Sequence, residues 1–127
     1  MKSTLVPVAL LLGTVGACNF ITTDRVCTDE LRFGLAVGVR DSATGLAAAS
    51  GATLIMVDQT GAIDSTKFPP NRPDLDPVPL LGAGEHAGTF RVTVRKLGYR
   101  DWVRSEVRVT RDECHVRVTA LTALLQR

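Results

Sequence analysis

The chain has 127 residues, of which 45% are hydrophobic and 22% are charged, and its formal net charge is +2. This composition suits one globular domain and excludes a disordered chain. So small a net charge also argues against binding nucleic acid through the charge of the whole molecule. The charge is uneven, because residues 18–88 carry five basic and nine acidic side chains, whereas residues 89–127 carry nine basic and four acidic ones. The C-terminal third is therefore basic.

Residues 1–17 have the pattern of a secretory signal peptide. Lys2 supplies a positive amino end, residues 5–13 are apolar, and small residues lead up to Cys18. The apolar stretch contains Pro7 and is shorter than the roughly 20 residues that a membrane-spanning helix needs. We therefore expect residues 1–17 to be removed on export and residues 18–30 to form a tether.

Val15-Gly16-Ala17-Cys18 resembles the lipobox of bacterial lipoproteins. The resemblance implies that the Cys18 thiol receives a diacylglycerol and that acyl chains such as palmitate then anchor the protein to a membrane. Asn19 stands where an aspartate would be the inner-membrane retention signal of that family, which implies the outer membrane in a host that has one. The alternative is an ordinary signal peptide cleaved after Ala17.

The chain has three cysteines, Cys18, Cys27 and Cys114. If Cys18 carries lipid, the other two remain as an even pair in an oxidising compartment. A disulfide between them would close a loop of nearly the whole domain and stabilise it by roughly 4–5 kcal/mol in the chain-entropy model. The alternative is two free thiols. A metal site is disfavoured, because these two cysteines and His115 lack the paired spacing of metal ligands.

From residue 31 onward, apolar and polar residues alternate with the period of β-strands. In the last two strands we expect Val103, Val107, Cys114 and Val118 to point inward and His115 to point outward. Residues 68–79 hold five of the six prolines and are expected to form a loop that is either functional or loose. The expected strands are residues 31–40, 52–57, 90–95, 103–110 and 114–125.

Three short motifs carry a family resemblance: Gly88-Thr89-Phe90, Gly98-Tyr99 with Trp102, and Asp112-Glu113-Cys114-His115-Val116. Together they resemble the carboxypeptidase regulatory-like domain of secreted bacterial proteins over residues 31–125. The resemblance implies an all-β, antiparallel, seven-stranded transthyretin-like or immunoglobulin-like sandwich, here residues 31–127. It also implies an accessory or binding module, because this domain has no catalytic residues to carry over.

Candidate residues for catalysis or metal binding are few, and we expect neither an enzyme nor a cofactor. His115 follows Asp112 and Glu113, but its outward position favours a solvated or turn-capping side chain. His86 lies in a glycine-rich segment, which is a poor place to hold a catalytic base. The acidic residues that could meet around calcium lack the regular spacing of such loops. They are Asp74, Asp76 and Glu85.

Five arginines are expected on the outward faces of neighbouring strands, where they would form a basic patch suited to an anionic partner. The alternative is that they are ordinary solvated side chains. The protein is thus expected to be a non-catalytic envelope lipoprotein that binds an anionic glycan or an envelope protein, and not nucleic acid. A purely structural envelope protein and a transthyretin-like hydrolase are the alternatives. The five arginines are Arg91, Arg95, Arg104, Arg108 and Arg117.

Overall fold

The computed structural model describes residues 26–127, so the expected signal peptide (residues 1–17) and Cys18 lie outside the described residues. The described chain forms seven strands and one short 3-10 helix, η1 (Pro73–Leu75). The strands are β1 (Phe33–Asp41), β2 (Thr53–Asp58), β3 (Ile63–Lys67), β4 (Leu80–Gly84), β5 (Gly88–Arg95), β6 (Trp102–Val109) and β7 (Thr119–Leu125).

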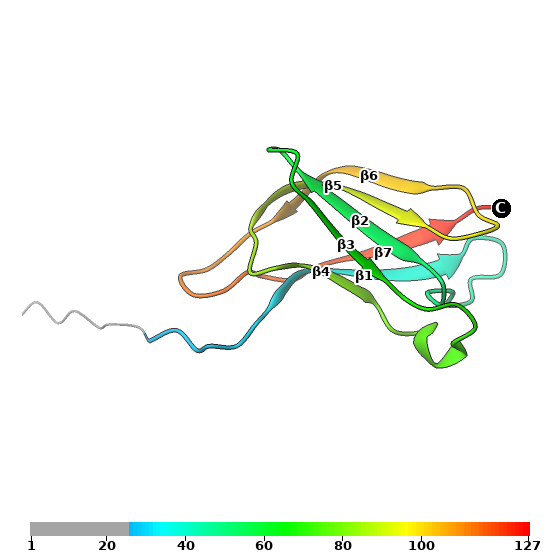
Figure 1. Ribbon diagram of the computed structural model, residues 1–127, viewed down its shortest axis with the longest axis horizontal. Helices are drawn as coiled ribbons and strands as arrows, with labels where there is room; N and C mark the ends of the chain where they lie inside the picture. Colours follow the sequence, from blue (N-terminus) through cyan, green and yellow to red (C-terminus); the bar gives the residue numbers. More distant parts are fainter. Residues whose placement is uncertain (1–25) are drawn as a thin grey trace, which may run out of the picture.

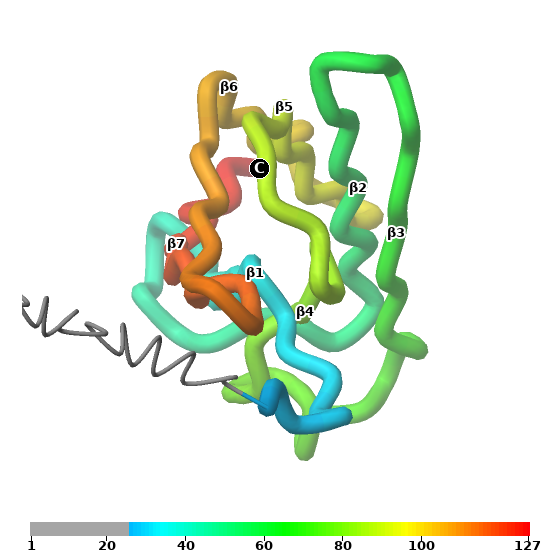
Figure 2. Tube along the Cα trace, turned by 90° about the vertical axis from the view of Figure 1, so that its left-hand side faces the viewer, coloured from blue at the N-terminus to red at the C-terminus, as the bar shows by residue number. Residues whose placement is uncertain are grey.

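The strands form two sheets that pack face to face. One sheet has the order β4-β1-β7 and the other has the order β3-β2-β5-β6 (Figures 1 and 2). The amino-terminal segment enters at one end, which we call the tether end, and the loops after β1, β3 and β5 lie at the opposite end, which we call the far end (Figure 1). The expected all-β class and the two-sheet sandwich are confirmed.

The expectation of a purely antiparallel fold is wrong for one pair of strands. β7 pairs with β1 in parallel, with Leu35 opposite Thr119 and Asp41 opposite Leu125. β6 ends at the tether end, where β1 begins, and the chain crosses there to the other sheet before β7 starts. β7 therefore runs in the same direction as β1.

Alternation along the strands places one apolar face of each sheet in a shared core. Leu35, Val37 and Val39 of β1 are buried against residues of the second sheet. Burying an aliphatic side chain of this size contributes about 1.5–3 kcal/mol, so the core is the main source of stability. From the second sheet, the core includes Leu54, Met56, Phe90, Val92, Val94, Val107 and Val109.

A β-bulge in β6 changes which residues point inward. Phe90 pairs with Val107 but Val92 pairs with Arg104, so β6 has one extra residue between these two pairs. Glu106, at the bulge, has a φ of 57°. As a result Val103 is 45% exposed, and the prediction that it points inward was wrong. Trp102, opposite Val94, is partly buried in its place.

Residues 114–118 are not a strand, contrary to expectation. β7 begins only at Thr119, and the preceding residues form a loop closed by a bridge between Arg111 and Val116. Val118, expected to point inward, is 63% exposed. Leaving the strand conformation breaks the in/out alternation: Val116 is buried as expected, but the adjacent His115 is buried as well and Val118 is exposed.

The proline-rich loop between β3 and β4 is fastened by hydrogen bonds. The Ser50 backbone N–H donates to Asp76 Oδ1 at 2.8 Å, and the Ser50 hydroxyl oxygen accepts from the Arg72 N–H at 2.9 Å. Gly51 N–H donates to the Pro69 carbonyl at 3.0 Å. These hydrogen bonds hold the loop against the turn that precedes β2.

Candidate functional site

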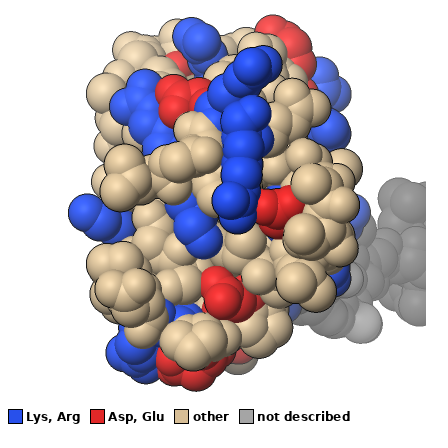
Figure 3. All heavy atoms as spheres, turned by 90° about the vertical axis from the view of Figure 1, so that its right-hand side faces the viewer, with Lys and Arg blue, Asp and Glu red and all other residues tan. Residues whose placement is uncertain are grey.

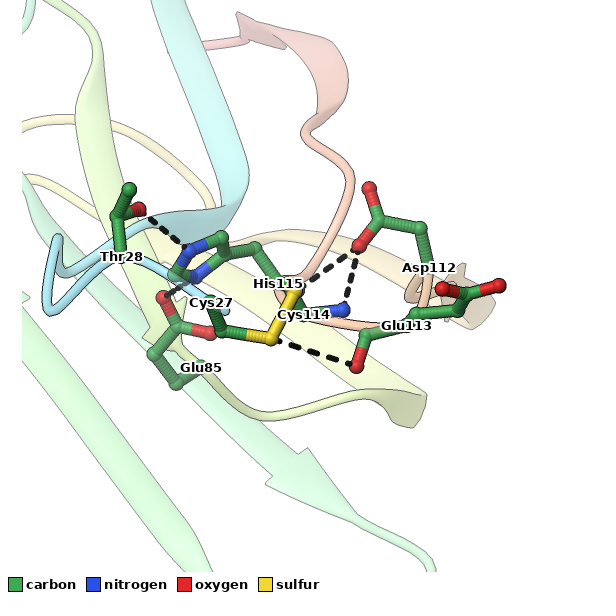
Figure 4. Close-up of a disulfide and its surroundings, with 7 residues drawn as sticks. All are labelled: Cys27, Thr28, Glu85, Asp112, Glu113, Cys114 and His115. Atoms are coloured by element: carbon green, nitrogen blue, oxygen red, sulfur yellow. Dashed lines mark hydrogen bonds and ion pairs between the residues drawn. A yellow bond between two sulfur atoms is a disulfide. The ribbon is translucent and has the colours of Figure 1, made fainter. Parts of the chain in front are cut away.

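The amino-terminal segment is bonded to the loop that precedes β7. Cys27 and Cys114 form a disulfide between positions 87 residues apart in the sequence, as predicted (Figure 4). The bond joins residues 26–32, which lie outside the sheets, to the body of the domain. The tether end is therefore fixed covalently.

His115, expected to face outward as a solvated or turn-capping residue, is instead 8% exposed, so its outward, solvated placement was wrong. Its ring lies between two side chains, with Nδ1 2.8 Å from Glu85 Oε1 and Nε2 3.0 Å from Thr28 Oγ1 (Figure 4). Asp112 sets this position by folding the loop: its Oδ1 accepts the backbone N–H groups of Cys114 and His115. The turn directs His115 toward the end of β4.

Glu85 is the second half of this contact. Its Oε1 atom accepts the backbone N–H of Arg32 at 2.8 Å, and its own N–H donates to the Arg32 carbonyl at 2.8 Å. The pKa of Glu85 is lowered below its usual value, mainly by the hydrogen bond from the Arg32 backbone N–H and, to a smaller extent, by the hydrogen bond with the His115 ring. Glu85 thus remains a carboxylate at neutral pH and holds the tether segment and the imidazole together.

Thr28, His115 and Glu85 occur in the order hydroxyl, imidazole, carboxylate, which is also the order of a hydrolase triad. Here they come from the tether segment, the loop before β7 and the corner after β4, and they lie next to the disulfide (Figure 4). Glu85 is shared with the backbone of Arg32. We therefore interpret the cluster as a fastening of three segments.

Sequence reasoning did not place Thr28 or Glu85 beside His115, although one signal was available for Thr28. A disulfide brings the neighbours of its two cysteines together, so Thr28 and His115 had to lie close once Cys27 and Cys114 were paired. Glu85 had no such signal, because only the fold brings the end of β4 to this place.

The remaining histidine and the acidic residues do not assemble a metal site. His86 is largely exposed, with Nε2 3.4 Å from Asp58 Oδ2. Glu85 lies at the tether end, whereas Asp74 and Asp76 lie in the far-end loop, so the calcium grouping is separated. Within residues 26–127, no three histidine, cysteine or acidic side chains are grouped closely enough to hold a metal ion.

The structure divides the five arginines among different surfaces. Arg91 and Arg95 project from the outer face of β5, and Arg108 projects from the same face of β6 because it pairs with Thr89. Arg104 pairs with the buried Val92 and lies over the Trp102 ring at 5.5 Å, so it is on the opposite face of β6. Arg117 lies outside the strands. All five arginines were expected on one face, but only three of them, Arg91, Arg95 and Arg108, lie on the same face.

These three arginines lie on the outer face of the four-stranded sheet. The register places Ile55 and Val57 of β2 on this face, next to the exposed Ile63 of β3 and Val103 of β6. The face therefore has an apolar centre with cations near its margin, and Arg95 is paired with Asp101 at 2.9 Å. The cations of this face are Lys67, Arg91, Arg95 and Arg108.

The far end is a second basic surface. Cations cross the middle of this end, with fewer acidic side chains among them (Figure 3). Its acidic side chains are engaged: for example, Asp74 accepts two hydrogen bonds from Arg72, and Asp101 accepts one from Arg95. Strand ends and loops place seven basic residues here, Arg40, Lys67, Arg72, Arg95, Lys96, Arg100 and Arg127, and four acidic ones, Asp41, Asp74, Asp76 and Asp101.

The buried Asp41 and the partly buried Tyr99 contact each other at the far end. Asp41 accepts the Tyr99 hydroxyl at 2.7 Å and the N–H groups of Ala43 and Thr44. The pKa of Asp41 is lowered to about 2, mainly by the hydrogen bond from the Tyr99 hydroxyl and, to a smaller extent, by the one from the Thr44 N–H. Arg127 lies over the Tyr99 ring at 5.1 Å and donates to its hydroxyl. This network joins the last residues of the chain to the loop after β1.

Comparison with known proteins leaves the chain without an assigned family. No protein-family model matches it, and neither a curated protein nor a solved structure is detectably similar. Over the part of the chain that is described, no helix is both long and apolar enough to cross a membrane. The function is therefore inferred from the residues and surfaces described above.

Proposed function

We propose that this protein is an exported, lipid-anchored binding module of a bacterial cell envelope. It acts without catalysis and binds an anionic partner through the outer face of its four-stranded sheet. The partner is an anionic envelope glycan or an acidic envelope protein.

Export and anchoring are supported by two observations. The Cys27–Cys114 disulfide suits an oxidising compartment outside the cytoplasm. Pairing of these two cysteines leaves Cys18 as the one cysteine available for acylation in a sequence with a lipobox-like motif. The outer membrane is the proposed location, on the basis of Asn19.

The outer face of β3-β2-β5-β6 is the observation that carries the binding role. Ile63 is 72% exposed there and Val103 is also exposed, although apolar side chains on a strand gain stability only when something covers them. Arg91 and Arg108 are near neighbours across β5 and β6. An apolar centre with arginines beside it suits an extended anionic partner, because arginine binds carboxylates and phosphates in a fixed geometry.

The proposed family is the carboxypeptidase regulatory-like group, with a transthyretin-like sandwich. Seven strands in a three-stranded and a four-stranded sheet support this affiliation at the level of architecture. The accessory role of such domains agrees with a binding module.

The binding role is tested by charge reversal on the sheet face. Arg91→Glu/Arg108→Glu is expected to abolish retention of the protein on immobilised anionic envelope polysaccharide or on cross-linked envelope protein. The matched control is Arg104→Glu/Arg117→Glu, which changes the charge equally but lies on other surfaces. Equal retention of both variants and of the wild type would refute the sheet-face proposal and favour a structural role.

The anchor is tested separately in cells. Labelling with radioactive palmitate is expected for the wild type and not for Cys18→Ala. Equal labelling of the two would exclude acylation of Cys18, whatever the outcome of the retention experiment.

A further inference from the structure

We propose that the far-end tip docks onto an anionic lipid surface. The far-end tip consists of Leu46, Lys96, Leu97, Arg100 and Arg127. In this arrangement the two leucines enter the bilayer interface and the three cations lie over lipid phosphates. The surface is separate from the sheet face, and this proposal does not depend on the one made above.

The tip is one surface, although its residues come from three segments. Lys96 Nζ donates to the Ala48 carbonyl at 2.8 Å, which joins the β5–β6 turn to the loop after β1. The Arg100 N–H donates to the Gln126 carbonyl at 2.7 Å, which joins the same turn to the end of the chain. Lys96 and Arg127 also lie over the Tyr99 ring. These contacts keep the leucines and cations at the same end of the sandwich.

The two leucines project from the molecule in a way that favours a bilayer over a protein partner. Leu97 is 98% exposed and Leu46 is 68% exposed, each in a turn between strands. A protein could bury both only with two hollows of matching shape and spacing. A lipid interface adapts to a projecting side chain, and burial of aliphatic groups together with attraction to anionic lipids is how peripheral proteins bind it.

Arg127 is paired with Asp41, with Nε 3.4 Å from Oδ2, so the positive charge of the tip rests mainly on Lys96 and Arg100. Asp41, the carboxylate closest to Tyr99, is buried and receives the hydroxyl of Tyr99 and two backbone N–H groups. Its negative charge is thus compensated within the fold. Lys96, Arg100 and Arg127 remain near the surface at the end where basic residues outnumber acidic ones (Figure 3). Such a cluster is attracted to anionic lipid headgroups within a Debye length.

The test measures sedimentation of the protein with lipid vesicles. The protein begins at residue 18 and carries Cys18→Ser, so that no acyl chain brings it to the membrane. Binding is expected to vesicles of phosphatidylglycerol mixed with phosphatidylcholine, to be weak on phosphatidylcholine alone, and to decrease with salt. Arg100→Glu is expected to weaken partitioning about tenfold, because it changes two charges beside the headgroups. Leu97→Ser is expected to weaken it about fivefold, because an apolar group no longer enters the interface.

Each variant has a matched control. Arg104→Glu makes the same charge change in β6, and Val118→Ser makes a similar apolar-to-polar change at an exposed position at the tether end. Both controls are expected to bind vesicles like the parent protein. The proposal is overturned if the parent protein does not sediment with phosphatidylglycerol vesicles at low salt. It is also overturned if each tip variant binds as well as its control.

Discussion

The imidazole of His115 and the hydroxyl of Thr28 lie 3.0 Å apart, each one residue beyond a cysteine of the disulfide. The covalent bond and the hydrogen bond therefore fasten the same two segments side by side. Glu85 extends the contact to the corner after β4 (Figure 4). The tether end is thus held by one covalent link and a short chain of hydrogen bonds.

Removal of the disulfide should destabilise the domain strongly. Cys27→Ala/Cys114→Ala is expected to lower the free energy of unfolding by about 4–5 kcal/mol, because the bond closes a loop of 87 residues in the unfolded chain. Urea unfolding followed by circular dichroism measures this value. Cys18→Ala is the control and should unfold like the wild type. A loss below about 1 kcal/mol would mean that the hydrogen bonds alone hold this end.

The two histidines should differ in their effect on stability. His115→Ala is expected to cost about 2 kcal/mol, because it removes a buried ring that contacts both Glu85 and Thr28. His86→Ala should cost less than about 0.5 kcal/mol, because the side chain is 53% exposed and its ion pair with Asp58 is solvated. Urea unfolding of both variants at pH 7 gives the comparison, and equal losses would contradict the buried role of His115.

Tyr99→Phe should alter the response to acid. The Tyr99 hydroxyl is the main cause of the lowered pKa of Asp41, about 2, so the variant should raise this pKa toward 3.8. A carboxyl with a lowered pKa stabilises the fold fully above its unfolded-state pKa, and this stabilisation is lost as pH falls from about 4 to about 2. The destabilisation caused by Tyr99→Phe should therefore be larger at pH 6 than at pH 2.

The pKa itself can be followed by NMR titration of the Asp41 carboxyl carbon. Asp58 provides an internal control, because its lowered pKa is caused mainly by Thr60 and should not respond to Tyr99→Phe. An unchanged Asp41 titration in the variant would show that another group sets this pKa.

Two glycines of β1 should respond differently to an added methyl group. In Gly34→Ala the new Cβ would overlap the Val109 side chain and lie 3.2 Å from the Ala83 carbonyl oxygen. We expect a loss of about 1–3 kcal/mol in the free energy of unfolding. In Gly38→Ala the nearest atom is the Leu121 carbonyl oxygen at 3.8 Å, so stability should stay within about 0.5 kcal/mol of the wild type. Similar unfolding curves for the two variants would contradict this packing of β1 on β6.

The sequence predicted strands correctly where apolar and polar residues alternate and the apolar side chains are buried in the core. It predicted the main course of β1, β2 and β5 and the pairing of Cys27 with Cys114. It missed β3 and β4, because Ile63–Lys67 is largely exposed and Leu80–Gly84 is short and glycine-rich. The strand conformation of both segments depends on pairing with neighbours, which a single sequence does not display.

The errors at the candidate sites have a common physical cause. A loop in place of strand at residues 114–118 interrupts the alternation, so His115 is buried beside Val116. One extra residue in β6 shifts the alternation by one position, which exchanges inward and outward side chains and exposes Val103. For the same reason, Arg104 does not share a face with Arg108. Bulges and loops depend on tertiary packing, and periodicity alone did not predict them.

Under the proposed lipid anchor at Cys18, the position of the disulfide would also limit how far the domain can move from the membrane. For a protein held by lipid at Cys18, about nine residues lead to Cys27, and a fully extended chain of that length spans roughly 30 Å. If both the disulfide and the hydrogen bonds of Thr28 and Arg32 were broken, the free segment would extend to Phe33, about 15 residues and roughly 50 Å. In an anchored protein, fastening residues 27–32 to the domain would therefore shorten the free segment by about two-fifths and confine the domain to a thinner layer above the bilayer.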